Sequence, residues 1–124
     1  MNPADMYSFV LLALCIWREA RGEDVPTKLA VAWSIRNRVQ LPRWWGHNWT
    51  GVILMHEQYS SFNPNDPNAV KLPFQTDPSW ADSLTAASQV FPDSLLVSDP
   101  TGGATSYFDQ SMDLHPPKIG RAHV

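Results

Sequence analysis

The sequence has a single cysteine, Cys15, and no apolar run long enough to cross a membrane. Without a second cysteine the chain forms no internal disulfide, so the fold needs no oxidising compartment. The most apolar stretch, residues 9–17, is well short of the about 20 residues that a spanning helix needs. It also has no basic segment before it and no small-residue cleavage site after it. We therefore expect no signal peptide and no membrane anchor, and a chain made in the cytoplasm.

An excess of positive charge is also missing. The chain has 9 lysine and arginine residues against 12 acidic residues, which gives a formal net charge of −3. Proteins that bind nucleic acid through its phosphates are usually basic, so nucleic acid is not an expected partner. Hydrophobic residues make up 44% of the 124 residues, which supports one globular domain but not two. We expect residues 1–124 to form that single domain, as a monomer.

The motifs of several enzyme classes are absent as well. There is no G-x-S-x-G of a serine hydrolase, no H-E-x-x-H of a zinc protease and no glycine-rich phosphate loop. The histidines show no metal-ligand spacing and are scattered over His47, His56, His115 and His123. We expect no metal and no cofactor. Carboxyl chemistry among aromatic and amide side chains remains, and it is typical of glycosidases.

One carboxyl group stands out in the stretch Leu11–Glu23. If residues 12–21 are helical, Glu19 continues an apolar stripe that begins with Leu12, Cys15 and Ile16. Burial and the negative end of the helix dipole would both favour the neutral acid, which is the form that a general acid needs. The alternative is a structural Glu19 at the edge of the core, paired with Arg18, Arg21 or a later basic residue.

Capping signals and apolar spacing predict four helices, over residues 3–21, 26–41, 50–57 and 78–90. Asn2-Pro3 and Asp77-Pro78 combine a capping residue with a proline at the first helical position, and Thr50 is the expected cap of the third helix. The first two helices should pack as an antiparallel pair. Residues 95–97 and 104–108 are predicted to be strands of a small hairpin, with a turn at the glycine pair 102–103. The fold class is therefore mainly α, with a small β element.

Two connecting segments allow more than one interpretation. Residues 41–50 contain three of the six tryptophans, whose rings either cover the core or form a wall that stacks on sugar rings; Trp45 is our candidate for such stacking. Residues 58–77 are rich in proline and asparagine and are predicted to be a loop. This loop either lines a substrate groove or is an Ω-loop without contact to substrate.

Three blocks of sequence stand out along the chain. The first is E-A-R-G-E at residues 19–23, followed by A-V-A at 30–32 and N-R-V at 37–39. The second is Q-Y-S-S-F-N-P-N-D-P-N at residues 58–68, and the third is G-G-A-T-S-Y-F at residues 102–108. These blocks resemble, in the same order, those of the SleB-type family of cell-wall hydrolases, which includes spore-cortex-lytic enzymes and phage-borne relatives. The resemblance covers most of the chain, from about residue 11 to residue 108.

The resemblance implies a compact, lysozyme-like helical fold in which the β-hairpin lies beside a substrate groove. It also implies cleavage of the β-1,4 bond between N-acetylmuramic acid and N-acetylglucosamine in peptidoglycan, often as a lytic transglycosylase. Many relatives are exported or carry a wall-binding module. A short chain without a signal is similar to a phage endolysin that reaches the wall after release by a holin.

The resemblance also implies roles for single residues. Glu19 matches the family's catalytic acid, while Glu23 is the rival and is expected to be structural. Five positions of the second and third blocks are expected to bind substrate, with hydrogen bonds inside the loops as the alternative for the polar ones: Gln58, Tyr59, Ser60, Phe62 and Tyr107. Trp45 is a sixth expected substrate-binding residue, on the stacking argument given above and not on the resemblance. Tyr59 stands where the family usually has Phe. A hydrolytic muramidase would need a second carboxylate, for which Asp66 and Asp109 are the available residues.

Two other classes of protein remain as alternatives. The chain is either a non-catalytic module that binds peptidoglycan through residues 41–49, or an interaction domain of a virion or tail that uses exposed tryptophans as anchors. A binding module would not need Glu19, and an interaction domain would form a stable complex without acting on isolated walls.

Overall fold

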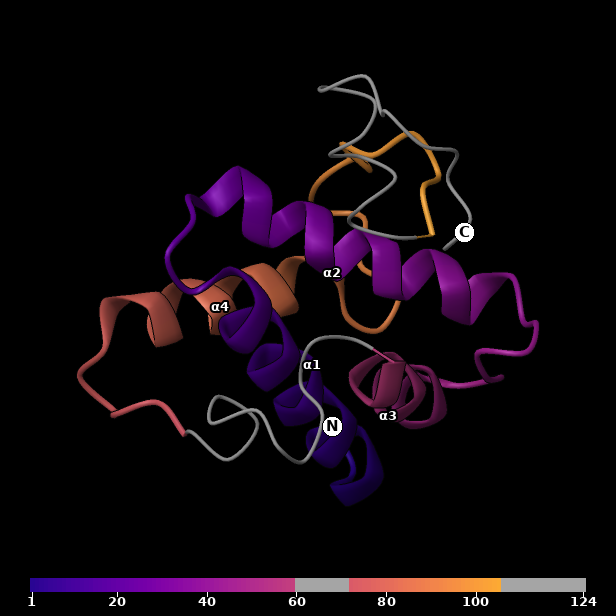
Figure 1. Cartoon of the computed structure of the whole chain (residues 1–124), viewed down its shortest axis with the longest axis horizontal. Coiled ribbons are helices and arrows are strands. Elements are labelled where there is room, and N and C mark those ends of the chain that lie inside the picture. Colours follow the sequence, from indigo (N-terminus) through magenta and orange to yellow (C-terminus); the bar gives the residue numbers. More distant parts are fainter. Residues whose placement is uncertain (60–71, 106–124) are drawn as a thin grey trace.

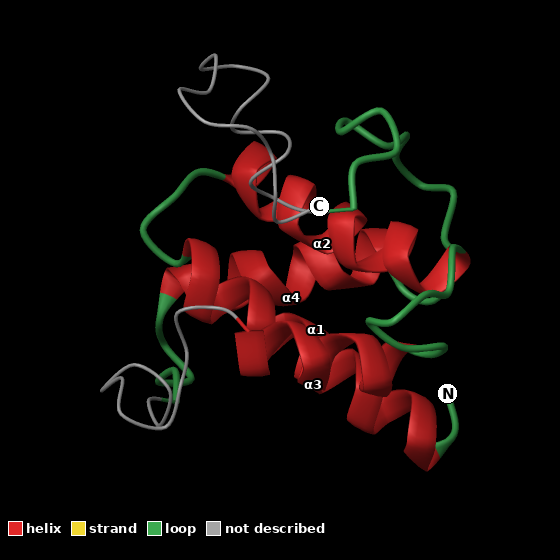
Figure 2. Cartoon of the chain, turned by 45° about the vertical axis from the view of Figure 1, so that its right-hand side comes forward, coloured by secondary structure: helices red, strands yellow, loops and turns green. Residues whose placement is uncertain are grey.

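The computed structural model describes residues 1–59 and 72–105, and these residues are mainly helical. Their four helices are α1 (Pro3–Ala20), α2 (Val25–Gln40), α3 (Trp49–Tyr59) and α4 (Pro78–Val90) (Figures 1 and 2). Helix α1 packs against each of the other three helices, and α2 packs against α3 and α4. The mainly α fold class is confirmed for the described residues, whereas the lysozyme-like arrangement stays a prediction.

Helix α1 begins as predicted and ends one residue earlier than predicted. The side chain of Asn2 accepts a hydrogen bond from the Asp5 backbone N–H at 2.8 Å, and Pro3 occupies the first turn. At the other end, the buried Lys28 ammonium donates to the carbonyl oxygens of Ala20 (2.9 Å) and Glu23 (2.7 Å). Ala20 is the last residue of α1, and its carbonyl oxygen also accepts from the Glu23 backbone N–H at 2.9 Å. Lys28 therefore ties the end of α1 to the connector that follows it. Within the described residues, no helix has the length and hydropathy of a membrane span.

Helix α2 runs back from the turn at residues 21–24, so that the first two helices form the antiparallel pair that the sequence predicts (Figure 1). Its cap is Asp24, whose carboxylate accepts from the Thr27 backbone N–H at 3.0 Å. Residue 24 lies between the first two predicted helices, and its role as a cap was not predicted. The helix ends at Gln40, two residues before Pro42, as expected from the restriction that proline imposes on the residue before it.

The predicted boundaries of α3 are wrong at both ends. Asn48 is the cap in place of Thr50, because its side chain accepts from the Gly51 N–H at 2.7 Å and its carbonyl from the Val52 N–H at 2.9 Å. The Thr50 hydroxyl instead contacts the Ser8 hydroxyl of α1 at 2.7 Å. At its C-terminal end the helix continues through residues 58 and 59, which the sequence analysis assigned to a loop.

Helix α4 begins at the predicted cap. Asp77 accepts hydrogen bonds from the Ser79 backbone N–H at 2.8 Å and from the Trp17 indole N–H at 2.9 Å. The bonds from Trp17 and Ser79 lower the pKa of the Asp77 carboxyl below its ordinary value. This one side chain therefore starts α4 and also ties it to the C-terminal half of α1.

The predicted β-hairpin is not seen. Residues 95–97 and 104–105 form no strand, and residues 106–108 lie outside the described residues. Asp99 explains much of this difference, since its carboxylate accepts from the Thr101 N–H at 2.7 Å and the Gly103 N–H at 2.9 Å. A side chain that takes up backbone N–H groups in this way competes with strand pairing. The segment therefore folds as a turn over residues 99–103.

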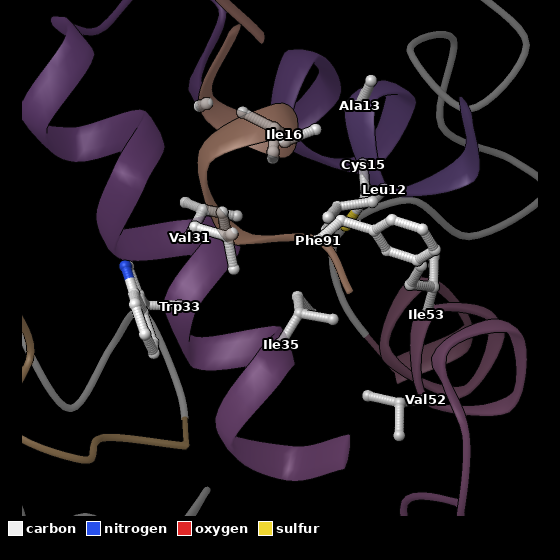
Figure 3. Close-up of a cluster of buried hydrophobic side chains, with 14 of the residues drawn as sticks. Leu12, Ala13, Cys15, Ile16, Val31, Trp33, Ile35, Val52, Ile53 and Phe91 are labelled. Atoms are coloured by element: carbon white, nitrogen blue, oxygen red, sulfur yellow. The ribbon is translucent and has the colours of Figure 1, made fainter. Parts of the chain in front are cut away.

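The core lies where the four helices meet (Figure 3). Each helix contributes buried apolar side chains, and Phe91 directly after α4 packs among them, with its ring centroid 4.9 Å from that of Trp49. The buried stripe of α1 includes Leu12, Cys15 and Ile16, as the spacing predicts. It faces side chains of the other helices that include Val31, Ile35, Val52, Ile53, Ala87 and Val90.

Gly46 allows the loop before α3 to lie close to the backbone of that helix, and this gives a first prediction. Its φ is +124°, and a Cβ at this position would lie 3.0 Å from the backbone of Gly51 and of Val52. We expect Gly46→Ala to lower the free energy of unfolding by more than about 1 kcal/mol, because the backbone conformation and the contact are both unfavourable for a side chain. Urea unfolding followed by circular dichroism measures the change.

Gly22→Ala is the matched control. A Cβ at Gly22 has no atom within 4 Å, and this residue does not have a positive φ in the strained range. We expect its stability to stay within about 1 kcal/mol of the wild type. Equal losses in the two variants would show that the close approach at Gly46 is not important for stability.

Candidate active site

Glu19 lies in the last turn of α1, where the apolar stripe reaches the edge of the core. Its side chain is 13% exposed, whereas Cys15 and Ile16 before it are fully buried. A carboxyl group with so little contact with water must be hydrogen-bonded within the protein. The structure therefore keeps Glu19 in the partly buried position that its spacing predicts.

Two side chains hydrogen-bond the same oxygen of Glu19. His56 of α3 places its Nε2 against Glu19 Oε2, and the Cys15 thiol donates to Oε2 with an Sγ to oxygen distance of 3.2 Å. The His56 side chain is as little exposed as that of Glu19. The partner of Glu19 is thus His56, a basic residue later in the chain, as the structural alternative also allows. The role of Glu19 as the acid stays a prediction.

Arg38 of α2 completes this group on the far side of the imidazole. One guanidinium nitrogen of Arg38 lies 3.4 Å from His56 Nδ1, and Arg38 itself is only 8% exposed. Arg38 Nε donates to the carbonyl oxygen of Thr105. The guanidinium also lies over the ring of Trp45, 5.3 Å from its centroid. Arg38 is therefore held on several sides, and it in turn contacts the Nδ1 edge of the His56 ring.

Asn37, next to Arg38, fastens the segment that contains the start of the third sequence block. Its side-chain amide donates to Asp99 at 3.0 Å and to the Ala104 carbonyl oxygen at 2.9 Å. Burial would raise the pKa of Asp99, but hydrogen bonds from Thr101, Asn37 and Gly103 outweigh burial and hold this pKa below its ordinary value. Asn37 and Arg38, which are neighbours in α2, thus both bind the segment 99–105. Arg38 also contacts His56, the partner of Glu19.

The other predicted site residues fall into two groups. Gln58 and Tyr59 lie in the final turn of α3, and their side chains are not described. Outside the described residues lie Ser60, Phe62 and Tyr107, and also the two possible second carboxylates, Asp66 and Asp109.

The tryptophans of residues 41–50 have different environments. Trp45 is 2% exposed, and its indole N–H donates to the carbonyl oxygens of Arg38 (3.1 Å) and Leu41 (3.2 Å). Its ring therefore covers the core and supports Arg38, which corresponds to the first of the two interpretations of this stretch. Trp44 is 59% exposed and is the ring of this pair that faces outward. Glu23, the rival acid, is exposed.

The sequence analysis did not assign a role to His56, although the sequence contains a signal for it. His56 follows Val52 by four residues and Ile53 by three, and both of these residues are fully buried. The helical spacing that selected Glu19 therefore also places His56 at the end of a buried stripe. What the sequence could not provide is the pairing of these two stripes, because it depends on how α1 and α3 pack.

The side chains around Glu19 include a set that is also typical of a metal site. The ligand atoms of Cys15, Glu19 and His56 lie within 4.8 Å of one another, and thiolate, carboxylate and imidazole are all ligands of zinc. A histidine that binds metal normally donates its other ring N–H to an acceptor. Here the other nitrogen, Nδ1, faces Arg38, which can only donate. The surroundings of His56 therefore favour a hydrogen-bonded carboxyl group over a metal site.

Comparison with known proteins gives one match. A family model described as Cell Wall Hydrolase matches residues 22–122, which is more than half of the chain. No curated protein and no solved structure matches the chain. The matched region contains Glu23 but begins three residues after Glu19. The match therefore does not test the prediction that Glu19 is the acid.

The lowered pKa of Asp99 gives a second prediction. Since the pKa is lower in the folded than in the unfolded state, ionised Asp99 stabilises the fold at neutral pH, and this contribution is lost as the pH falls through the folded-state pKa. We expect Asp99→Asn to be less stable than the wild type at pH 7, and the difference to shrink below about pH 4. Urea unfolding at a series of pH values measures both curves, and parallel curves would contradict the prediction.

Proposed function

Because the chain belongs to the SleB-type family of cell wall hydrolases, and is therefore a peptidoglycan hydrolase, we propose that it is a glycosidase with Glu19 as its general acid. Its target is the β-1,4 bond between N-acetylmuramic acid and N-acetylglucosamine. The observation that carries this proposal is the environment of Glu19, a carboxyl group 13% exposed and hydrogen-bonded on one oxygen by His56 and Cys15. A largely dehydrated carboxyl group at the edge of a core is suited to proton transfer.

In the first step, neutral Glu19 gives its proton to the bridging glycosidic oxygen. The bond from C1 of the muramic acid to this oxygen breaks, and its electron pair stays with the oxygen. Positive charge develops at C1 while Glu19 becomes a carboxylate. The hydrogen bonds from His56 and Cys15 then stabilise the negative charge on Glu19.

In the second step, we propose that the 6-hydroxyl of the same muramic acid attacks C1. A new bond forms between C1 and the 6-oxygen, and the hydroxyl proton passes to the Glu19 carboxylate, which restores the acid. The products are a 1,6-anhydromuramic end and a free 4-hydroxyl on the N-acetylglucosamine. This route needs a single carboxyl group, whereas hydrolysis would need a second one, such as Asp66 or Asp109, to activate water.

The path of the chain supports the proposed substrate-binding residues. Gln58 and Tyr59 follow His56 within the same helix, so the second sequence block begins beside the contact between His56 and Glu19. The third block begins in a segment whose Thr105 is bound by Arg38. We propose that Gln58, Ser60 and Tyr107 bind N-acetyl and hydroxyl groups of the sugar, and that the rings of Tyr59 and Phe62 pack on its apolar faces.

A digest of purified peptidoglycan, with its products read by mass spectrometry, tests this proposal. We expect the wild type to release anhydromuramic ends. Glu19→Gln should release them at least about 100-fold more slowly, because the amide cannot donate a carboxylic proton. Glu19→Gln should still sediment with intact walls. Reducing ends in place of anhydro ends would establish a muramidase and contradict the transglycosylase part of the proposal.

Glu23→Gln is the matched control, because Glu23 belongs to the same sequence block but is exposed. We expect it to retain the wild-type rate. Loss of activity in Glu23→Gln with full activity in Glu19→Gln would transfer the acid role to Glu23. Binding to walls with no products from any variant would instead support a binding module, for which the exposed Trp44 would be the natural contact.

A further inference from the structure

We propose that His56 is a positioning residue that determines which oxygen of Glu19 carries the transferred proton. In this arrangement, the Nε2–H of His56 keeps Glu19 Oε2 as a hydrogen-bond acceptor, and the acidic proton is on Oε1. The inference rests on the proposed role of Glu19 as general acid. It adds a function for His56 and Arg38 that the resemblance to the family did not assign.

The first step of the argument concerns the tautomer of His56. Arg38 carries only hydrogen-bond donors, and its guanidinium approaches His56 Nδ1 at 3.4 Å. For this contact to be a hydrogen bond, Nδ1 must be the acceptor and carry no hydrogen. A neutral imidazole then carries its hydrogen on Nε2. Arg38 thus selects the Nε2–H tautomer.

The second step concerns the oxygen that Nε2 contacts. With its hydrogen on Nε2, His56 donates to Glu19 Oε2, and the Cys15 thiol at 3.2 Å from the same oxygen is a second donor. An oxygen that accepts two hydrogen bonds is poorly placed to carry an acidic hydrogen of its own. The proton of the neutral carboxyl group is therefore on Oε1, which is the oxygen that gives it to the glycosidic oxygen and later receives the 6-hydroxyl proton.

The third step is the rigidity of the arrangement. Arg38 is bound to the Thr105 carbonyl oxygen and lies over Trp45, and its burial prevents water from replacing it. Among the described residues, two titratable or charged side chains contact His56: Glu19 from α1 and Arg38 from α2. A third, Cys15 from α1, donates to the same Glu19 oxygen as His56. Three helices therefore fix one proton position, and a general acid works best when its proton is pre-aligned with the leaving oxygen.

The tautomer is measurable without any activity. Nitrogen-15 NMR of protein labelled at histidine distinguishes a ring nitrogen that carries hydrogen from one that does not, and the His56→Gln variant identifies the His56 signals by their loss. We expect hydrogen on Nε2 and none on Nδ1 at the pH at which the enzyme works. Hydrogen on Nδ1, in the neutral ring or in the imidazolium, would overturn the inference.

Kinetics of two variants test the consequence. His56→Gln retains an N–H group near the position of Nε2, whereas His56→Leu offers no donor. We expect His56→Leu to lower kcat about 10-fold to 100-fold with little change in KM, and His56→Gln to recover most of this loss. Thermal unfolding checks that both variants are folded. If His56→Leu does not fold, the comparison of His56→Gln with the wild type and the NMR result still decide the question.

The outcomes separate this inference from the proposed function. If Glu19→Gln is inactive and folded His56→Leu matches the wild-type kcat, the inference fails while Glu19 remains the acid. If Glu19→Gln is fully active, the proposed function fails, whatever the tautomer of His56. A loss in His56→Leu that His56→Gln does not reduce would assign His56 a merely structural role and would also overturn the inference.

Discussion

A carboxyl group at the edge of a hydrophobic core has to be hydrogen-bonded, and this requirement connects three of the four helices. Glu19 comes from α1, the imidazole that contacts it from α3, and the guanidinium behind the imidazole from α2. If any one of these polar side chains were buried without its partner from another helix, its burial would cost several kcal/mol. Once the helices pack, each polar group satisfies the next, so the site and the core depend on the same arrangement.

The arginine in this group, Arg38, connects the site to the loops around it. Its side chain donates a hydrogen bond to the Thr105 carbonyl oxygen and lies over the ring of Trp45. The Trp45 indole N–H in turn donates to the Arg38 carbonyl oxygen. Gly46 follows directly and allows the chain to approach α3 closely. Helix α3 begins only three residues after Gly46. A shift of this loop would therefore move α3, and with it the His56 side chain that contacts Glu19.

Local chemistry made much of this fold predictable. The starts of α1 and α4 follow from Asn2 and Asp77, whose side chains accept backbone N–H groups within four residues of themselves. The position of Glu19 follows from helical spacing alone. The same kind of local signal misled where two residues competed, since both Asn48 and Thr50 are good caps and Thr50 is used instead for a contact with Ser8 of α1.

Contacts between distant parts of the chain were not predictable in this way. The hairpin was inferred from two apolar segments around a glycine pair, but Asp99 takes up the backbone N–H groups of that turn and is itself held by Asn37 from α2. His56 illustrates the same limit. Its spacing marks it as half-buried, but only the packing of α3 against α1 identifies Glu19 as its partner.

The family and the geometry give independent information about this chain. The matched region begins at Gly22, so membership of the family does not depend on Glu19, and it says which polymer is degraded without selecting the acid. The proposal that Glu19 is the acid rests on the geometry, without reference to the polymer. Glu23 lies inside the match but is exposed, whereas Glu19 is largely enclosed and accepts hydrogen bonds on one oxygen. Packing, and not sequence similarity, is therefore what distinguishes the two carboxyl groups.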